Sequence, residues 1–347
     1  MNRFQPGLQT QAVNKLLENK NNILIIGHSN PDGDAIGSSL ALAAYLRLCG
    51  KNARVLMPDP FPDFLNWLPG ASDIFIFIQQ KKESIRIIKD SEIIFCLDFN
   101  SLNRLGPLEK QIAQSGLPMV LVDHHLEPDK NFDAQIHTIE VSSTSELVFE
   151  LILHLPQKVE ITKEIASCLY VGIMTDTGSF SYSCNNVRTY EITAHLVNTG
   201  LDVREIHNLI YDTFSENRLR LMGHLLLNRM KVLPEFATAY IYMSIKDQEK
   251  FGFTPGDSEG FVNYALSIKG IRFAAFFTEK KELIRISFRS KGDFSVNDFA
   301  RKHYLGGGHR NAAGGNSLFK LRSELKHFEN LLTEYKEELT NADKIVM

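Results

Sequence analysis

Cysteine is scarce in this chain of 347 residues, which contains four cysteines and one tryptophan. The cysteines lie far apart and form no Cys-x-x-Cys pair, so a disulfide framework or a cysteine metal site is the less favoured interpretation. Most of them lie in apolar segments. We therefore expect buried free thiols in a reducing compartment. The four residues are Cys49, Cys96, Cys168 and Cys184.

Long apolar runs are also missing, since none approaches the roughly 18 uncharged residues of a membrane span. The first 22 residues lack the apolar core of a signal peptide. The net charge is −3, from 38 basic and 41 acidic residues, so the chain has no global positive field for long duplex nucleic acid. These absences predict a cytoplasmic location, without membrane contact. The length favours two domains.

The first half of the chain alternates short apolar runs with helical patterns. Continuous apolar strands separated by helices are typical of a parallel sheet that helices cover on both faces. Gly50 is the expected C-terminal stop of the first of these helices. We expect strands at 22–28, 53–57, 74–78, 92–100, 119–125 and 166–178, and helices at 34–50 and 144–155.

Three helical patterns follow from about Val187, and Ser215 is the expected N-cap of the last one. We interpret this long helix as a connector between two domains. Apolar runs at 236–245, 271–280 and 282–290 then predict strands of a second sheet. The predicted fold class is α/β, with an N-terminal doubly wound, mainly parallel sheet and a smaller α/β domain with a mixed sheet. The expected limits are 1–212, 213–233 for the connector, and 234–347.

Acidic and histidine side chains follow four of the expected strands. In an open parallel sheet the carboxyl ends of the strands line the ligand crevice, so these side chains should lie together. A single such motif is usually an ordinary loop, but four in order indicate a site. The residues are His28, Asp32, Asp34, Asp98, Asp123, His124, His125 and Asp176.

So many acids would repel one another and raise one another's pKa unless cations lay among them. Carboxylates together with imidazoles suit Mn²⁺, and Mg²⁺ or Co²⁺ less closely. Six or more ligands exceed the usual protein share of one ion, so the pattern predicts two ions. Two ions about 3.5–4 Å apart are a standard device for hydrolysing phosphate esters.

With these residues in view, the chain resembles the DHH phosphoesterase family. That family includes RecJ-type exonucleases, manganese inorganic pyrophosphatases, cyclic-dinucleotide phosphodiesterases and nanoRNases that also dephosphorylate 3′-phosphoadenosine 5′-phosphate (pAp). The leading His28 favours the members with small substrates over the RecJ type. The matching segments are "HSNPDGDAIGSS" (28–39), "LDFNSLNRLG" (97–106), "VDHH" (122–125), "GIMTDTGSF" (172–180) and, in the domain that commonly follows, "GGGHRNAAGG" (306–315).

The resemblance implies a role for each residue of the site. One metal would be held by His28 and Asp32, and the other by Asp34 and His124. Asp98 would bridge the two metals, and Asp176 would complete the ligand set. Asp123 would orient an imidazole, and His125 would stabilise charge on the phosphate or protonate the leaving oxygen. The metals would activate the attacking water.

In the second domain, the resemblance implies residues that bind the far end of a short nucleotide chain. Successive glycines allow backbone N–H groups to converge on a phosphate, and a guanidinium can bind it with two hydrogen bonds. For the glycines a tight turn is the alternative, and for Arg289 a surface ion pair. The candidates are Arg289, Ser290, Gly307, Gly308 and His309.

Three further features have a structural and a functional interpretation. Ser143 and Glu146 fit a capping box, which we favour, although the segment 142–146 also resembles a family segment near the site. Arg104 and Arg188 follow two of the motifs and either contact phosphate or lie on the solvated surface.

The sequence therefore predicts a cytoplasmic, Mn²⁺-dependent phosphoesterase with two metal ions. It would degrade short single-stranded oligoribonucleotides (nanoRNA) to mononucleotides and convert pAp to AMP. One alternative is a phosphodiesterase for cyclic di-AMP or linear dinucleotides, and another is an inactive nucleotide-binding regulatory module. We expect no long duplex nucleic acid and no membrane as partner, and a homodimer is compatible with this interpretation.

Overall fold

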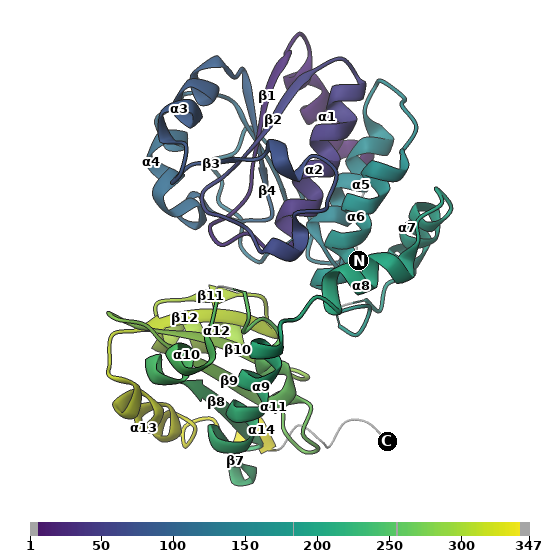
Figure 1. Ribbon diagram of the computed structural model, residues 1–347. Helices are drawn as coiled ribbons and strands as arrows, with labels where there is room; N and C mark the ends of the chain where they lie inside the picture. The colour runs from purple at the N-terminus through teal and green to yellow at the C-terminus, as the bar shows by residue number, and fades with distance from the viewer. Residues whose placement is uncertain (1–5, 183, 255, 341–347) are drawn as a thin grey trace. The chain divides into compact units, whose positions relative to one another are not determined.

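The computed structural model describes residues 6–182, 184–254 and 256–340. The chain divides into two compact units, Met1–Thr213 and Phe214–Met347 (Figure 1). Within the described ranges, no helix combines the length and the apolar character of a membrane-spanning segment. All four cysteines are free, as expected, and three of them are buried.

A six-stranded parallel sheet forms the centre of the first unit, with the strand order β3-β2-β1-β4-β5-β6. The order reverses between β1 and β4, which is the point where doubly wound sheets bind their ligands. The strands are β1 (Asn22–Ile26), β2 (Asn52–Met57), β3 (Phe75–Ile76), β4 (Ile93–Leu97), β5 (Met119–Asp123) and β6 (Ala134–His137).

Both faces of this sheet are buried, which explains why its strands are continuously apolar. In β1, Ile23 and Ile25 face one hydrophobic cluster, and Leu24 and Ile26 face another. Figure 1 shows α1, α2, α5 and α6 on one side of the sheet and α3 and α4 on the other. The helices are α1 (Pro6–Leu17), α2 (Gly33–Leu48), α3 (Lys81–Asp90), α4 (Glu109–Ala113), α5 (Thr144–His154), α6 (Lys163–Asp176), α7 (Val187–Val197) and α8 (Val203–Tyr211).

Two segments that we predicted as strands differ in the structure. The run 166–178 belongs to helix α6, whose N-cap Thr162 accepts a hydrogen bond from the backbone N–H of Ile165. This helix is buried on nearly every side, so its sequence lacks the polar face that would have marked it as helical. The run 74–78 forms only the two-residue strand β3.

The buried helices α2 and α6 pack closely because glycines face each other at their contact. A Cβ atom on Gly37 would lie 2.4 Å from the carbonyl oxygen of Cys168 and 3.0 Å from the backbone nitrogen of Gly172. Contacts that short do not occur, so no larger residue fits at position 37 without a backbone shift. The close approach brings the end of α6 to the start of α2.

The second unit is built on a mixed sheet with the order β11-β12-β10-β9-β8-β7, in which only the β8–β9 pair is parallel among the described strands. The predicted fold class is thus confirmed. The strands are β7 (Met230–Leu233), β8 (Thr238–Met243), β9 (Phe273–Glu279), β10 (Ile284–Ser290), β11 (Gly307–Gly308) and β12 (Ala312–Ser317). The helices are α9 (Glu216–Asn228), α10 (Ile245–Phe251), α11 (Phe261–Leu266), α12 (Val296–His303), α13 (Leu321–Leu331) and α14 (Lys336–Thr340).

The long helix expected to begin at Ser215 and to fill the connector 213–233 is shorter in the structure. Ser215 caps it as predicted by accepting from the N–H of Arg218, but α9 ends at Asn228. Met230–Leu233 pairs with β8 instead, because antiparallel pairing at the sheet edge satisfies its backbone groups. Leu221 and Leu225 of α9 pack into a hydrophobic cluster of the second unit.

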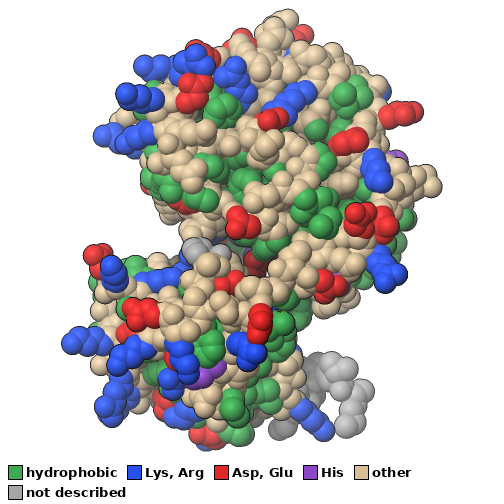
Figure 2. All heavy atoms as spheres, in the orientation of Figure 1, with side chains coloured by type: hydrophobic (Ala, Val, Ile, Leu, Met, Phe, Trp, Pro, Cys, Tyr) green, Lys and Arg blue, Asp and Glu red, His purple; other side chains and the backbone are tan. Residues whose placement is uncertain are grey.

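Charged side chains are mixed on the visible surface of both units. On the face drawn in Figure 2, Lys and Arg side chains lie among Asp and Glu side chains, and the described basic residues form no continuous field there. This distribution agrees with the small net charge of −3.

We expect Gly37→Ala to destabilise the protein by about 1–3 kcal/mol, because the new methyl group overlaps the backbone of α6. The matched control is Gly223→Ala in helix α9, where a Cβ would meet nothing within 4 Å. That change should stabilise by about 0.5–1 kcal/mol, as alanine does in an open helix position. Calorimetric unfolding of both variants measures the difference. A Gly37→Ala protein as stable as wild type would contradict the close packing.

Candidate metal centre and active site

The predicted site residues of the first unit meet where the strand order reverses. His28 follows β1, Asp98 follows β4, and Asp123 ends β5, and these three strands are neighbours in the order β1-β4-β5. Asp34 lies in the first turn of α2. Asp176 is the last residue of α6, so a helix and not the predicted strand delivers it.

Six of the predicted ligands form two of the groups that could hold a metal ion, and within each group the ligand atoms lie within 4.8 Å of one another. The first group contains His28, Asp32 and Asp98. The second contains Asp34, His124 and Asp176.

Asp98 faces both groups. Its Oδ2 lies 3.5 Å from Nε2 of His28, and its Oδ1 lies 3.5 Å from Nε2 of His124. One carboxylate thus turns one oxygen to each group, as the predicted bridging role requires. The side chain is buried, with 3% of its surface exposed.

The backbone of Asp98 has a φ of 64°, in the left-handed region. Aspartate tolerates this conformation better than most residues, but it still costs free energy. The N–H of Asp98 donates to the carbonyl oxygen of Val122 at 3.1 Å, which ties the turn to β5. A left-handed turn at the end of β4 therefore aims this carboxylate at the site, and such strain is common in functional residues.

The electrostatics of the site show unbalanced negative charge. Burial and the carboxylates of Asp98 and Asp176 raise the pKa of Asp34 well above its usual range. Burial, with the charges of Asp98 and Asp32, raises the pKa of Asp176 to about 6. Burial would lower the pKa of His124, but the neighbouring carboxylates of Asp98, Asp176 and Asp34 raise it to about 10.

His28 and Asp98 show the same balance. Burial opposes the charged form of each group, yet hydrogen bonding to Asp98 and the charge of Asp32 raise the pKa of His28. Likewise, His124 and His28 hold the pKa of Asp98 well below its usual range. Several buried acids therefore rely on imidazolium charges that divalent cations would replace. Carboxylate oxygens and imidazole nitrogens in these numbers fit Mn²⁺ well.

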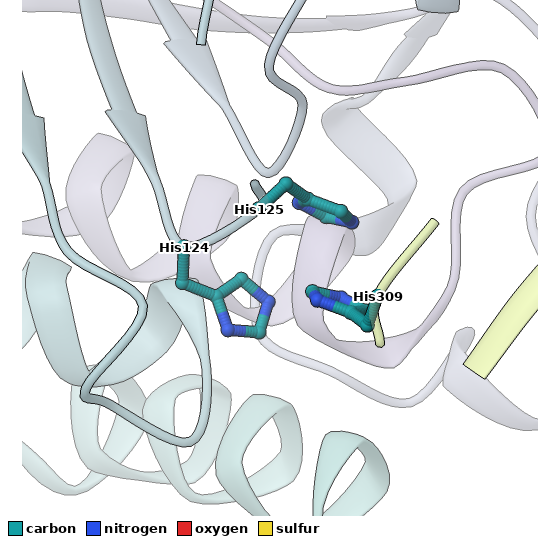
Figure 3. A group of neighbouring side chains, drawn as sticks. All are labelled: His124, His125 and His309. Carbon is teal, nitrogen blue, oxygen red and sulfur yellow. The ribbon is translucent and has the colours of Figure 1, made fainter. Parts of the chain in front are cut away.

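Asp123 and His125 form a hydrogen-bonded pair that adjoins Asp98, and the three residues make a further group with metal-ligand spacing. Oδ1 of Asp123 accepts from Nδ1–H of His125 at 2.7 Å, and Oδ2 accepts from the backbone N–H of His125 at 3.1 Å. Figure 3 shows the His124 and His125 rings following one another along the chain at the end of β5, edge to face, with centroids 5.1 Å apart. Asp123 is fully buried, so its carboxylate has little freedom to move. Its hydrogen bond to Nδ1–H therefore fixes the orientation of the His125 ring.

The candidate substrate-binding residues of the second unit differ in their exposure to solvent. Arg289 lies on the more exposed face of β10. The hydroxyl of Ser290 is buried; it donates to the carbonyl oxygen of Phe294 at 2.7 Å and accepts from the Asn311 amide at 2.8 Å. Ser290 therefore braces the loop that follows β10.

The glycine segment forms the tight turn that was the alternative to a phosphate-binding backbone, because N–H groups of the segment are hydrogen-bonded within the second unit. The N–H of Gly308 donates to Oδ1 of Asn297 at 2.9 Å, and the N–H of His309 donates to the Ala312 carbonyl at 2.7 Å. A Cβ on Gly306 would lie 2.0 Å from the carbonyl oxygen of Gly314. The glycines thus allow a tight hairpin between β11 and β12. The assignment of Gly307, Gly308 and His309 to substrate stays a prediction.

Comparison with known proteins agrees with this geometry. A model of the DHH family, N-terminal domain, matches residues 22–173, and a model of the DHHA1 domain matches residues 236–341. An exopolyphosphatase-related protein from Bacteroides fragilis, of known structure, is 42% identical, with a TM-score of 0.91 over 96% of this chain and 97% of that one. The chain belongs to the DHH family.

Curated relatives extend the comparison. The bifunctional oligoribonuclease and PAP phosphatase NrnA of Bacillus subtilis is 29% identical over 296 residues, which are 84% of this chain and 88% of that protein. The cyclic-di-AMP phosphodiesterase PdeA of Listeria monocytogenes is 25% identical over 318 residues, 88% of this chain and 46% of that protein. RecJ of Thermus thermophilus in complex with Mn²⁺ shares the fold, with a TM-score of 0.54 and 14% identity, over 97% of this chain and 55% of that one.

In this DHH-family chain, the sequence interpretation missed how the segment 142–146 supports the metal groups. The N–H groups of Thr144 and Ser145 donate to Asp34 at 2.6 and 2.9 Å, and the Ser145 hydroxyl donates to it at 2.6 Å. The Thr144 hydroxyl donates to Oδ1 of Asp98 at 2.9 Å. The start of α5 therefore holds two of the predicted ligands.

The capping box that we favoured is present only in part. Ser143 caps α5 by accepting from the N–H of Glu146 at 3.2 Å, as predicted. Glu146, however, accepts from Ser142 and from the Thr189 hydroxyl, not from the backbone of Ser143. The similarity of segment 142–146 to a family segment near the site correctly indicated that this segment contacts the predicted metal ligands.

The two arginines that we considered as phosphate ligands lie in different surroundings. Arg188 forms ion pairs with Glu150 at 2.6 Å and Glu191 at 3.0 Å, which fits the surface interpretation. Arg104 is half-buried, and its positive charge opposes the rise in the pKa of His28 that hydrogen bonding to Asp98 and the charge of Asp32 cause. Arg104 is therefore electrostatically close to the first metal group.

We expect Thr144→Val to weaken Mn²⁺ binding by roughly 10- to 100-fold, the usual effect of losing a partner that orients a metal ligand. Valine keeps the shape of threonine but cannot donate to Asp98. Thr144→Ser keeps the donor and should bind Mn²⁺ nearly as well as wild type. Thr193→Val in α7, whose hydroxyl donates to the Thr189 carbonyl, is the control. Calorimetric titration with Mn²⁺ measures the affinity of each variant. An unchanged affinity in Thr144→Val would contradict the role of Thr144 in orienting Asp98.

Proposed function

We propose that this protein is a phosphoesterase with two divalent metal ions, Mn²⁺ above all, that acts on short oligoribonucleotides and on pAp. The observation that carries the proposal is the Asp98 carboxylate, which turns one oxygen to each of two ligand groups. The similarity to NrnA over 84% of the chain supports the choice of substrates. Cleavage would release mononucleotides from nanoRNA and AMP from pAp, in the cytoplasm.

The chain supplies a complete ligand set for two ions. His28 and Asp32 would hold one ion and share Asp98 with the other, for which Asp34, His124 and Asp176 complete the set. When bound, the two ions would neutralise charge on the phosphate and lower the pKa of the attacking water. The role of the protein is to keep these six side chains preorganised, which the buried hydrogen bonds of Asp34 and Asp98 do.

His125 is the proton donor in this proposal. A nucleoside hydroxyl is a poor leaving group, so its oxygen needs a proton as the P–O bond breaks. Asp123 holds Nδ1–H of His125 and stabilises the charged imidazolium, which leaves Nε2 as the ring atom that would protonate the leaving oxygen. In the second unit, Arg289 would bind a substrate phosphate that is not being cleaved.

A second candidate is a phosphodiesterase for cyclic di-AMP or linear dinucleotides, and the similarity to PdeA favours it. The same two-metal chemistry would serve both. Initial rates with Mn²⁺ on pAp, an RNA trimer, a longer RNA and cyclic di-AMP separate the candidates. Fastest turnover of cyclic di-AMP would replace our proposal with this one. No turnover of any substrate, in the presence of bound Mn²⁺, would favour a nucleotide-binding regulatory module.

We expect Asp98→Asn to reduce turnover of pAp by more than about 100-fold, which is the upper end for residues that only orient a ligand. Asparagine keeps the shape but loses the charge and the second strong ligand oxygen that a bridge between two ions needs. Asp90→Asn, at the exposed end of α3, is the control and should be as active as wild type. If folded Asp98→Asn kept more than a few per cent of wild-type activity, the two-metal assignment would be wrong.

We expect Arg289→Ala to cost about 1.5–3 kcal/mol in kcat/KM for pAp or an RNA dimer, as for a lost charge-assisted hydrogen bond. Bis-p-nitrophenyl phosphate has no second phosphate, so its hydrolysis should barely change. Arg322→Ala, an exposed position of α13, controls for the loss of one positive charge. Equal losses on both substrates would mean that Arg289 supports the fold or the chemistry, and not substrate binding.

A further inference from the structure

His137 contacts the proposed proton donor from the edge of the first sheet. It is the last residue of the edge strand β6 and lies in register beside Asp123 of β5. Residues in register on parallel strands point to the same face of the sheet. From this position, Nε2–H of His137 donates to the backbone carbonyl oxygen of His125 at 2.6 Å.

The backbone of His137 is itself held by a side chain from the start of the chain. Oε1 of Gln9 in α1 accepts from the N–H of His137 at 3.0 Å, and its amide Nε2 donates to the carbonyl oxygen of His137 at 3.4 Å. An edge strand lacks a partner on one side, and the Gln9 amide takes the place of that partner. The N–H and the carbonyl group of His137 thus have hydrogen-bond partners that do not involve the imidazole. The ring can therefore bind a different part of the chain.

The imidazole of His137 completes the support of His125. Asp123 binds the backbone N–H and the ring Nδ1–H of His125, at 3.1 and 2.7 Å, but nothing in that pair fixes the carbonyl. His137 binds this carbonyl, and the amide of Asn100 binds the next one, of Leu126, at 2.6 Å. The loop after β5 is therefore held at two successive peptide groups, which restricts rotation about the backbone of His125.

We propose that His137, held by Gln9, is a positioning residue for His125. It acts by binding the His125 carbonyl, and so keeps the ring aligned with the leaving oxygen. The charged imidazole and the neutral Nε2–H tautomer both donate from Nε2, and the carbonyl acceptor selects that tautomer, so the role does not depend on titration of His137. The proposal rests on the proposed function, in which His125 protonates the leaving oxygen.

His137→Phe tests this, because phenylalanine keeps a ring of similar size but has no donor. We expect kcat for pAp to fall roughly 10- to 100-fold, with KM changed less than about twofold, as for other groups that orient a functional side chain. Hydrolysis of bis-p-nitrophenyl phosphate should change less than about twofold, since p-nitrophenolate leaves without a proton. His137→Gln places an amide N–H near the former Nε2 and should restore most of the rate. His154→Phe, an exposed histidine at the end of α5, is the matched control.

Equal losses on both substrates, or no rescue by His137→Gln, would overturn the proposal in favour of a structural role. No loss in His137→Phe would overturn it outright. If the wild-type protein hydrolyses neither substrate, the proposed function fails instead, and a second readout tests His137 alone. The ring N–H resonance of His125, assigned by its absence in His125→Ala, should shift in His137→Phe and return in His137→Gln. An unchanged resonance in His137→Phe would also overturn the positioning role.

Discussion

The carboxylate of Asp98 is the group on which the rest of the site depends. It is buried, it comes from a left-handed turn, and each of its two oxygens lies 3.5 Å from a different imidazole nitrogen. A buried charge of this kind is costly unless it is paired and hydrogen-bonded. His28, His124 and the hydroxyl of Thr144 supply that pairing in the protein. Removing any of these partners leaves the carboxylate less well placed to bridge two cations.

Accommodating several buried acids costs folding free energy. A carboxyl group whose pKa is raised in the folded protein prefers to be neutral there. The raised pKa of Asp176, about 6, therefore removes stability as the pH rises from its unfolded value of about 4 through 6. Asp34 has the same sign of effect. Cations between these groups would favour the charged forms and offset the loss, so metal binding would also stabilise the fold.

Much of the site was predictable from the sequence because strand ends are a strong signal. Apolar runs that stop at His28, Asp98 and Asp123 correctly placed these residues at one edge of a parallel sheet. Asp176 was correctly predicted to lie at the site, but a helix and not the expected strand carries it. A helix that is buried on nearly all sides and a buried strand have the same apolar composition, so the sequence pattern does not separate them. The close contact of α2 and α6, which turns Asp176 toward the site, is a tertiary property that local sequence cannot show.

The residues that orient the ligands were harder to find, because serine, threonine and glutamine have ordinary structural uses. In the sequence, Thr144 and Ser145 look like the start of an ordinary helix. Their partner Asp34 lies 110 positions from Thr144 in the sequence, and only the folded structure brings its carboxylate oxygens to these two residues. Gly172 shows the same dependence on tertiary contact. A Cβ there would lie 1.9 Å from the Ser145 hydroxyl and 2.7 Å from Oδ1 of Asp34, so glycine leaves the space in which these two groups meet.

The supports of the metal groups and of His125 come from different parts of the first unit. Asp34, Asp98 and Asp176 depend on the central contacts among α2, α5 and α6, where a change in packing moves several ligands together. His125 depends on the β5–β6 edge, through Asp123 and, as we propose, through His137 and Gln9. The two sets of supports meet at Asp98, whose Oδ1 lies 3.8 Å from Nδ1 of His125 and 3.5 Å from Nε2 of His124. The proposed proton donor and the predicted bridging ligand are therefore neighbours, although different elements hold them in place.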